Sequence, residues 1–406
     1  MKLIIILVPI CSLLNMTLSC KNDVDQVSNK EFYSINVDDF RETIDLKLTD
    51  LADSFRIVVL ETTKECLLKN PSFFVSQDYI VAVSQGSSYE PVYYKFSANG
   101  KFIRKIINNG RGPQEISAMA NHYFDEDKNT LYLNDLNKNY LIVYDLVSDQ
   151  FKNIIKKSMS GSLLDFGIID DSLIVSTYYN PKKLLDPYCL YLQNFQGNII
   201  SKISNSKKIL VGVDKTEAFQ QINLYNFNKN YFIKFIRDDT VFLLKNNKLI
   251  PYIAFNFKNT RTYPPSSILK NGDQGFSVTY IAKNFILFRI WTAENVTYYS
   301  GGNVSSDGKS DYFLFNKETG EQLKIKSYTN DYIMSKKLSS QDISFPWRLN
   351  SRRIIIVLNP FDINRIFTDT IHNNYQKFDG FKHLQNISSN IKETDNPVLL
   401  IGQIKN

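Results

Sequence analysis

Short runs in which apolar and polar residues alternate recur along the chain. A two-residue period of this kind is typical of β-strands that bury one face. Six such runs follow turn-forming or charged residues, and another strand-like run precedes each of them. The six runs are YIVAV, TLYLND, SLIVST, YFIKFI, FILFRI and IIIVL, which begin at Tyr79, Thr130, Ser172, Tyr231, Phe285 and Ile354.

Most copies continue into a hairpin of two further strands. Gly, Asn and Asp tolerate the positive φ that tight hairpin turns require. The repeat is therefore a four-stranded antiparallel sheet. Radial packing buries both faces of such sheets, so six copies predict an all-β fold, a six-bladed β-propeller with four-stranded antiparallel blades. The hairpin turns fall at Asn99-Gly100, Ser148-Asp149, Gln196-Gly197, Asn246-Asn247 and Thr319-Gly320.

The sixth copy is incomplete, because its third strand, PVLLIGQIK, ends close to Asn406. The run FRIVVLE, from Phe55 to Glu61, precedes the first copy and has no blade of its own. We therefore expect this N-terminal strand to complete the last blade and to close the ring. The alternative is an open array, which would leave unpaired backbone groups at an exposed edge.

The start of the chain has the composition of a signal peptide. Lys2 is followed by an apolar run, Leu3 to Leu14, that is too short to span a membrane. Ser19 directly precedes Cys20, as at the cleavage site of a bacterial lipoprotein. We predict that residues 1–19 are removed and that acyl chains on Cys20 anchor the protein to a membrane. The alternative is an ordinary secretory signal followed by a chance cysteine.

Residues 20–42 are predicted to form a polar tether, and residues 43–406 the propeller. The formal net charge is +7 and the basic residues are scattered, so no nucleic-acid partner is expected. Besides Cys20, the processed chain keeps Cys66 and Cys189. We expect two buried free thiols, with a disulfide between them as the alternative.

Three stretches together resemble the six-bladed β-propeller lipoproteins of Bacteroidota, relatives of NHL-type propellers. They are LKLTDLADSFRIVVLETT at residues 46–63, the hairpin that runs into GRGPQE at residues 92–115, and TDNPVLLIGQIK at residues 394–405. The resemblance covers the chain from the lipoprotein start onward. It implies fold and export, and it carries over no catalytic residues. This chain departs from the usual pattern at Gln114 and Ile116, where Gly and an aromatic residue are more common.

The stretch KIINNGRGPQEI links the outer strand of the first blade to the inner strand of the second. Gly110 and Gly112 allow backbone angles closed to other residues and Pro113 fixes φ, which predicts a structural turn. The turn does not account for Arg111. Its guanidinium either pairs with Glu115 or a neighbouring blade, or faces the channel mouth and binds an anionic ligand. A phosphate loop is excluded, because no helix and no Lys-Ser/Thr pair follow the glycines.

Two further candidate ligand-binding residues, His122 and Arg348, fall on predicted inner strands. Polar residues there either contact a ligand or only hold channel water. With three histidines in the chain and one on an inner strand, no metal site is expected, and no cofactor either.

Long connections on the face called the top supply the remaining candidates. The segment from Trp291 to Tyr312 is interpreted as a long aromatic loop. Within it, Trp291, Tyr298 and Tyr299 either stack on a sugar or peptide or pack on the next blade. The insertion at residues 362–396 is predicted to form one or two short helices that lie on the same face.

Three functions are consistent with this pattern. The leading hypothesis is a non-enzymatic binding or scaffold propeller, lipid-anchored at the outer membrane on its surface or periplasmic side, that recognises a glycan, a peptide or a partner protein through its top face. The second is a propeller enzyme, a lyase or hydrolase acting on peptide or glycan, although no Gly-x-Ser-x-Gly elbow and no carboxylate pair stand out. The third is a partner subunit for an outer-membrane transporter.

Overall fold

The computed structural model describes residues 32–40, 42–85, 91–108, 110–117, 119–135, 137–158, 162–169, 172–179, 188–204, 222–227, 229–235, 238–257, 274–298, 304–333, 337–339, 347–349, 352–368 and 379–405. The first 31 residues, which include Cys20 and the predicted signal peptide, lie outside this part of the chain. All statements below concern the unit Phe32–Asn406.

The first three sheets are four-stranded antiparallel meanders, as the alternating pattern predicts. Sheet 1 consists of β4 (Ser72–Val75), β5 (Tyr79–Gln85), β6 (Pro91–Ser97) and β7 (Phe102–Ile107). Sheet 2 consists of β8 (Met119–Asp125), β9 (Thr130–Asp135), β10 (Tyr140–Asp145) and β11 (Gln150–Lys156). Sheet 3 consists of β12 (Ser162–Ile169), β13 (Leu173–Tyr179), β14 (Tyr188–Asn194) and β15 (Ile199–Ser204).

The other three sheets also take strands from the N-terminal segment. Sheet 4 consists of β16 (Ile222–Phe227), β17 (Asn230–Phe235), β18 (Thr240–Lys245), β19 (Lys248–Asn256) and β1 (Tyr33–Asn36). Sheet 5 consists of β20 (Gln274–Ile281), β21 (Phe285–Tyr298), β22 (Val304–Asn316), β23 (Gln322–Thr329), β24 (Lys337–Ser339) and β2 (Glu42–Lys47). Sheet 6 consists of β25 (Trp347–Leu349), β26 (Arg353–Leu358), β27 (Val398–Ile404) and β3 (Ala52–Val59).

The five predicted hairpin turns are confirmed by their backbone angles. Each contains at least one residue with positive φ, the conformation that Gly, Asn and Asp adopt at least cost. These residues are Gly100, Asp149, Gly197, Asn246, Asn247 and Gly320.

The predicted fold class needs correction in its account of the N-terminal segment. The sequence predicts uniform four-stranded antiparallel blades and one closing strand, but the N-terminal segment supplies strands to three sheets. β1 and β2 pair in parallel with β19 and β23, so sheets 4 and 5 are mixed and exceed four strands. β3 pairs antiparallel with β27, with Ile57 opposite Leu400. The 3-10 helix η1 (Val37–Asp39) and the helix α1 (Leu48–Leu51) connect the three strands.

The cause of this error is the polar composition of residues 20–42, which favours a free tether. The tether boundary is wrong at its C-terminal end, because Tyr33 and Ile35 are buried in sheet 4. Two isolated apolar residues in a polar segment are a weak strand pattern, and the pairing becomes visible only when the edge of β19 is in place.

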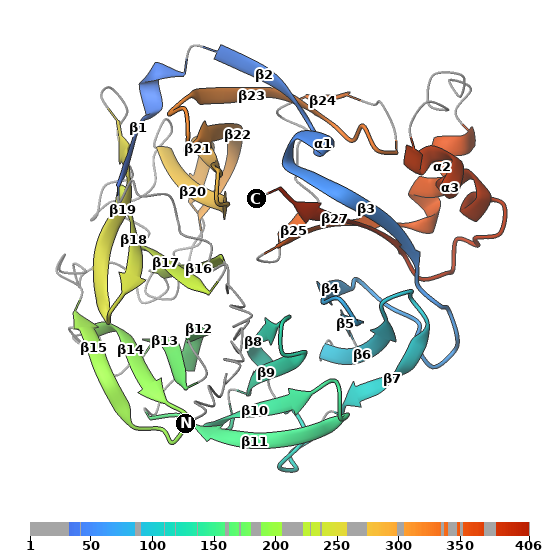
Figure 1. The fold of residues 1–406 in the computed structure, drawn as a ribbon, viewed down its shortest axis with the longest axis horizontal. Coiled ribbons are helices and arrows are strands. Elements are labelled where there is room, and N and C mark those ends of the chain that lie inside the picture. Colours follow the sequence, from blue (N-terminus) through green and yellow to red (C-terminus); the bar gives the residue numbers. More distant parts are fainter. Residues whose placement is uncertain are drawn as a thin grey trace, which may run out of the picture. The chain divides into compact units, whose positions relative to one another are not determined.

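Each sheet packs face to face on the next, which is the packing of a β-propeller (Figure 1). Separate apolar clusters join sheets 1 and 2, sheets 2 and 3, and sheets 3 and 4. Phe255 of sheet 4 lies 4.2 Å from Phe276 of sheet 5, measured between ring centroids. Phe55 of β3 stacks at 4.7 Å on Tyr332, which follows sheet 5 in the chain.

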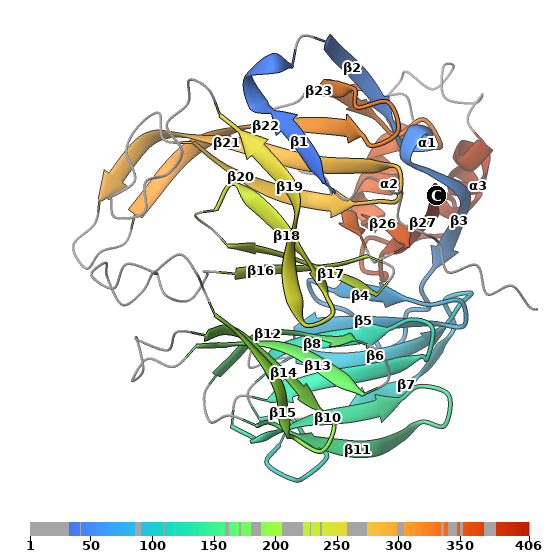
Figure 2. The ribbon, with the colours of Figure 1, turned by 60° about the vertical axis from the view of Figure 1, so that its left-hand side comes forward.

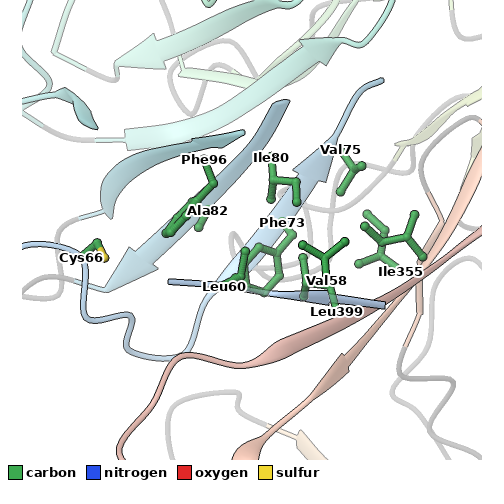
Figure 3. Close-up of a cluster of buried hydrophobic side chains, with 11 residues drawn as sticks. Val58, Leu60, Cys66, Phe73, Val75, Ile80, Ala82, Phe96, Ile355 and Leu399 are labelled. Carbon is green, nitrogen blue, oxygen red and sulfur yellow. The ribbon is translucent and has the colours of Figure 1, made fainter. Parts of the chain in front are cut away.

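Sheets 6 and 1 meet through a further cluster, which Figure 3 shows in close-up. It includes Val58 and Leu399 from sheet 6 and Phe73 and Phe96 from sheet 1, all buried. Burying one such side chain contributes about 1.5–3 kcal/mol. Buried Asn396 adds polar contacts at this joint, because its Nδ2 donates to the carbonyl oxygens of residues 61 and 66 at 2.8 Å each.

The predicted helical insertion is present as α2 (Pro360–Thr368) and α3 (Asp379–Ser388). Its predicted position on the top face is wrong, because the helices lie beside β3 on the outer side of sheet 6 (Figure 1). Phe381 and Leu384 are buried there, and the amide of Gly380 donates to the carbonyl oxygen of Tyr332 at 2.9 Å. In the described residues, no helix has both the length and the apolarity to cross a bilayer.

The segment predicted as a long loop from Trp291 to Tyr312 is largely regular. β21 and β22 pair from Phe285 and Asn316 out to Tyr298 and Val304, so the hairpin projects beyond the other strands (Figure 2).

Candidate functional site

The inner strand β8 directs its side chains into the neighbouring sheets. The His122 ring packs edge-on against Phe74 of sheet 1 at 4.7 Å, and its Nδ1 lies 3.1 Å from the Tyr93 hydroxyl. On the opposite face of the strand, the Tyr123 ring lies 6.4 Å from that of Phe166 in the neighbouring sheet 3, and its hydroxyl accepts a hydrogen bond from Asn226 Nδ2 of the non-adjacent sheet 4 at 3.2 Å. Burial raises the pKa of Tyr123 to about 12, so it stays a neutral phenol.

This placement follows from radial packing. Both faces of a blade contact neighbouring blades, and therefore an inner strand presents mainly its backbone edge to the axis. His122 is thus brought together with Phe74 and Tyr93, and the structure does not bring it to Arg111. Alternation along a strand predicts which side chains share a face, but it does not place that face toward the axis.

The turn between β7 and β8 is held by its own backbone. The Gly110 amide donates to the Ile116 carbonyl at 3.0 Å, and the Ile116 amide donates to the carbonyl of residue 108 at 3.0 Å. The Glu115 carboxylate accepts from the Gly112 amide at 2.9 Å. A methyl group on Gly110 would lie 1.9 Å from that carboxylate, so a larger residue there would displace Glu115 from the Gly112 amide.

Lys138 of sheet 2 also stabilises the turn. Its Nζ donates to the carbonyl oxygen of Gly112 at 2.6 Å and to that of Glu115. Buried Asp135 then anchors the entry to β8, because its carboxylate accepts from the Ser117 amide at 2.8 Å and from the Ser117 hydroxyl. The turn is therefore a rigid platform, in agreement with the predicted structural role of its glycines.

Arg111 stands at the tip of this platform and is exposed. Of the alternatives for Arg111, pairing with Glu115 is not found in the described residues, where the Glu115 carboxylate accepts from the Gly112 amide. No hydrogen bond or ion pair joins Arg111 to another residue in the part of the chain that is described. An exposed guanidinium on a rigid turn can bind a carboxylate, sulfate or phosphate through two parallel hydrogen bonds.

The other predicted site residues are placed only in part. Trp291 is half-buried in β21, opposite Gly275 and Ser310. For Tyr298 and Arg348 the structure describes the backbone alone, in β21 and β25. Tyr299 and Cys20 lie outside the described residues.

The cysteine prediction is tested at one position. Cys66 is a buried free thiol, as expected. The side chain of Cys189 lies outside the described part.

A group of charged residues that the sequence pattern does not single out lies in and directly after the turns that follow the inner strands of sheets 2, 4 and 6. Arg352 of sheet 6 pairs with Asp127 of sheet 2 at 2.7 Å, and Lys229 of sheet 4 lies 3.5 Å from the same carboxylate. Arg353 pairs with Glu126 of sheet 2. These contacts join three non-adjacent sheets. The signal in the sequence is the run Glu126–Lys128, the single Lys229 and the pair Arg352–Arg353, charges that are also common in ordinary turns.

Metal chemistry has no visible basis in the described residues, which contain no group of three or more His, Cys, Asp or Glu placed to hold a metal ion.

The fold is similar to that of solved structures from Bacteroides. A crystal structure of a candidate exported protein from Bacteroides fragilis NCTC 9343 aligns with a TM-score of 0.61 at 16% identity, and covers 92% of this chain and 100% of its own. A member of the DUF4221 family from Bacteroides vulgatus ATCC 8482 aligns with a TM-score of 0.45 at 11% identity, and covers 87% of this chain and 97% of its own. No curated protein matches the chain.

The Bacteroides fragilis origin of the first structure fits the predicted resemblance to a Bacteroidota family, whereas the relation to NHL-type propellers stays a prediction. The sequence model of a family described as a domain of unknown function, DUF4934, matches residues 32–403. The chain therefore belongs to the DUF4934 family.

Proposed function

We propose that this protein is a binding or scaffold propeller that holds an anionic group of a glycan, peptide or partner protein at Arg111. The proposal rests on one observation: the charged residues at this turn differ in whether they are bonded to its backbone. Lys138 and Glu115 are both bonded to the backbone of the turn, whereas Arg111 is exposed at its tip. The turn is rigid without Arg111, so the arginine is available for a ligand at little cost in ordering.

The proposal includes export and lipid anchoring through Cys20, with the propeller at the outer membrane. Support comes from the lipoprotein-like start of the sequence. We expect Cys20→Ser to move the protein from the membrane fraction to the soluble fraction. Recovery of the variant in the membrane fraction would show that another segment provides the anchor.

The binding proposal is tested by thermal shift with libraries of acidic and neutral glycans and peptides. A compound that binds only the folded state raises Tm. We expect hits among acidic compounds, with Kd raised about tenfold to a hundredfold by Arg111→Ala, because charge-assisted hydrogen bonds contribute about 1.5–3 kcal/mol.

Gln114→Ala is the matched control, since Gln114 is an exposed uncharged residue of the same turn. The control variant should keep the affinity of the native protein. Acidic hits that bind Arg111→Ala equally well would place the site elsewhere. A transporter partner, the narrower form of the proposal, is tested by co-purification from membranes with the native chain and with Arg111→Ala.

A further inference from the structure

The outer edges of the sheets already accept additional strands in this protein. β1 adds to β19 and β2 adds to β23, both in parallel register. β2 contains Glu42, Asp45 and Lys47, and β23 contains Lys324 and Lys326 with no acidic residue. The added strand β2 is held by the main-chain ladder and by a hydrogen bond from the Ser327 hydroxyl to Asp45, while Lys324 pairs with Asp311 of β22.

In the described chain, sheets 1, 2 and 3 end in β7, β11 and β15, with no further strand added. These strands contain basic residues and no acidic ones. On β11 the charge of Lys152 is compensated by Asp145 at 2.8 Å, and on β15 Lys202 lies over the Tyr188 ring. Lys156 of β11 has no ion pair in the described residues, but β7 carries two such cations, Arg104 and Lys105, which makes the β7 edge the strongest candidate of the three.

The β7 edge consists of Phe102–Ile107 and the preceding Lys101. Lys101, Ile103, Arg104 and Lys105 are exposed, and in the described part of the chain no carboxylate forms an ion pair with these three cations. The start of this edge already binds a carboxylate, because the Phe102 amide donates to Glu61 Oε2 at 2.8 Å. An exposed isoleucine among cations suits a segment that alternates acidic and apolar residues.

We propose that the β7 edge accepts an acidic, extended segment of a partner protein as an additional strand of sheet 1. This surface is separate from the Arg111 turn and does not depend on the function proposed for that turn. Lysine on an edge strand also discourages unwanted pairing. Binding of an acidic segment distinguishes a docking edge from a protective one, because an edge that only prevents pairing would bind no acidic segment.

The probe is a synthetic peptide with the sequence of residues 38–49, DDFRETIDLKLT, which includes the acidic strand β2. It is added to the full-length protein, and binding is measured by fluorescence anisotropy and by hydrogen exchange. With the peptide bound, we expect slower hydrogen exchange of the β7 amides. For the double variant Arg104→Glu, Lys105→Glu, we expect a Kd about tenfold higher than that of the native protein. A second peptide carries Asn or Gln in place of Asp38, Asp39, Glu42 and Asp45. It should bind the native protein at least as weakly as the acidic peptide binds the double variant.

Lys202→Glu on β15 is the matched control for charge reversal on an outer strand, and it should leave binding unchanged. Three results would overturn the proposal: no saturable binding, protection confined to β23 through exchange with β2, or equal binding of the acidic and amide peptides. Slower exchange at β7 without added peptide, accompanied by a dimer in size-exclusion chromatography, would assign the edge to a second copy and would also overturn it.

Discussion

Lys317 is a buried cation in a largely aromatic setting. Its Nζ donates to the Tyr252 hydroxyl at 3.1 Å and to the Ala282 carbonyl, and it lies 5.7 Å from the centre of the Tyr33 ring. Burial lowers the pKa of Lys317 to about 7, from a usual value of about 10.5. Tyr33 belongs to β1, so this lysine lies where the N-terminal segment meets sheets 4 and 5.

The depressed pKa makes stability depend on pH. Between about pH 7 and pH 10.5 the unfolded chain keeps the Lys317 proton and the folded chain releases it, so the free energy of unfolding rises with pH in this window. It is lowest and flat below about pH 7. We expect Lys317→Met to reduce this rise by a few kcal/mol, measured by urea denaturation from pH 6.5 to 9.5. Lys234 is buried with a pKa lowered to about 8, so part of the rise remains in the variant.

Lys324→Met is the control for this measurement. Lys324 is partly exposed and pairs with Asp311 at 2.8 Å, on the same sheet as Lys317. Its variant should follow the pH profile of the native protein within about 0.5 kcal/mol. Identical profiles for Lys317→Met and the native protein would show that the lysine is hydrated in solution.

At the scale of elements, two hairpin turns allow the joint between sheets 6 and 1 to be tested. Gly100 and Gly320 both end such turns with positive φ, +88° and +75°. A methyl group on Gly100 would lie 2.1 Å from the Val59 carbonyl oxygen in β3, whereas one on Gly320 meets nothing within 4 Å. The two substitutions by alanine therefore share the backbone strain and differ in the contact with β3.

We expect Gly320→Ala to lower the free energy of unfolding by about 1 kcal/mol, the usual cost of a left-handed conformation for a non-glycine residue. Gly100→Ala should cost about 2–3 kcal/mol more, because β3 must move away from sheet 1. Chemical denaturation measures both values. Equal costs would mean that β3 does not rest on the sheet 1 turn in solution.

Elements of the candidate site were predictable to different degrees. The turn at Gly110 and Gly112 follows from the sequence, because paired glycines and a proline specify a local conformation. The bond between Glu115 and the Gly112 amide was not predicted, since a nearby arginine is the more obvious partner for a carboxylate. Lys138 lies between β9 and β10 of sheet 2, more than 20 residues after the turn that it contacts, so the sequence of the turn itself does not predict this contact.

At the scale of the whole molecule, the repeating strands and hairpin turns could be read from alternation and turn residues alone. The path of the N-terminal segment could not. β1 and β2 are short and polar, and their stability comes from the edges of β19 and β23, which lie more than 200 residues away in the chain. The outward position of the helices has the same origin, because it depends on contacts with β3 and Tyr332.

The last prediction concerns the ion pairs between the charged turns of sheets 2 and 6. The Arg353–Glu126 pair is largely buried, with 18% and 10% of the side chains exposed. The Arg352–Asp127 pair is more open, at 39% and 35%. Loss of one partner costs most where the other stays buried, so Glu126→Gln should destabilise the protein by about 2–3 kcal/mol.

Asp127→Asn should cost no more than about 1 kcal/mol at low salt. Its effect should disappear in 1 M NaCl, where the screening length is about 3 Å, whereas the effect of Glu126→Gln should persist because water and ions reach that pair poorly. Urea denaturation at 0.05 M and 1 M NaCl separates the two cases. If both variants respond to salt alike, the contacts among sheets 2, 4 and 6 act as one solvated network, and the stability of the ring then rests on the apolar clusters between adjacent sheets.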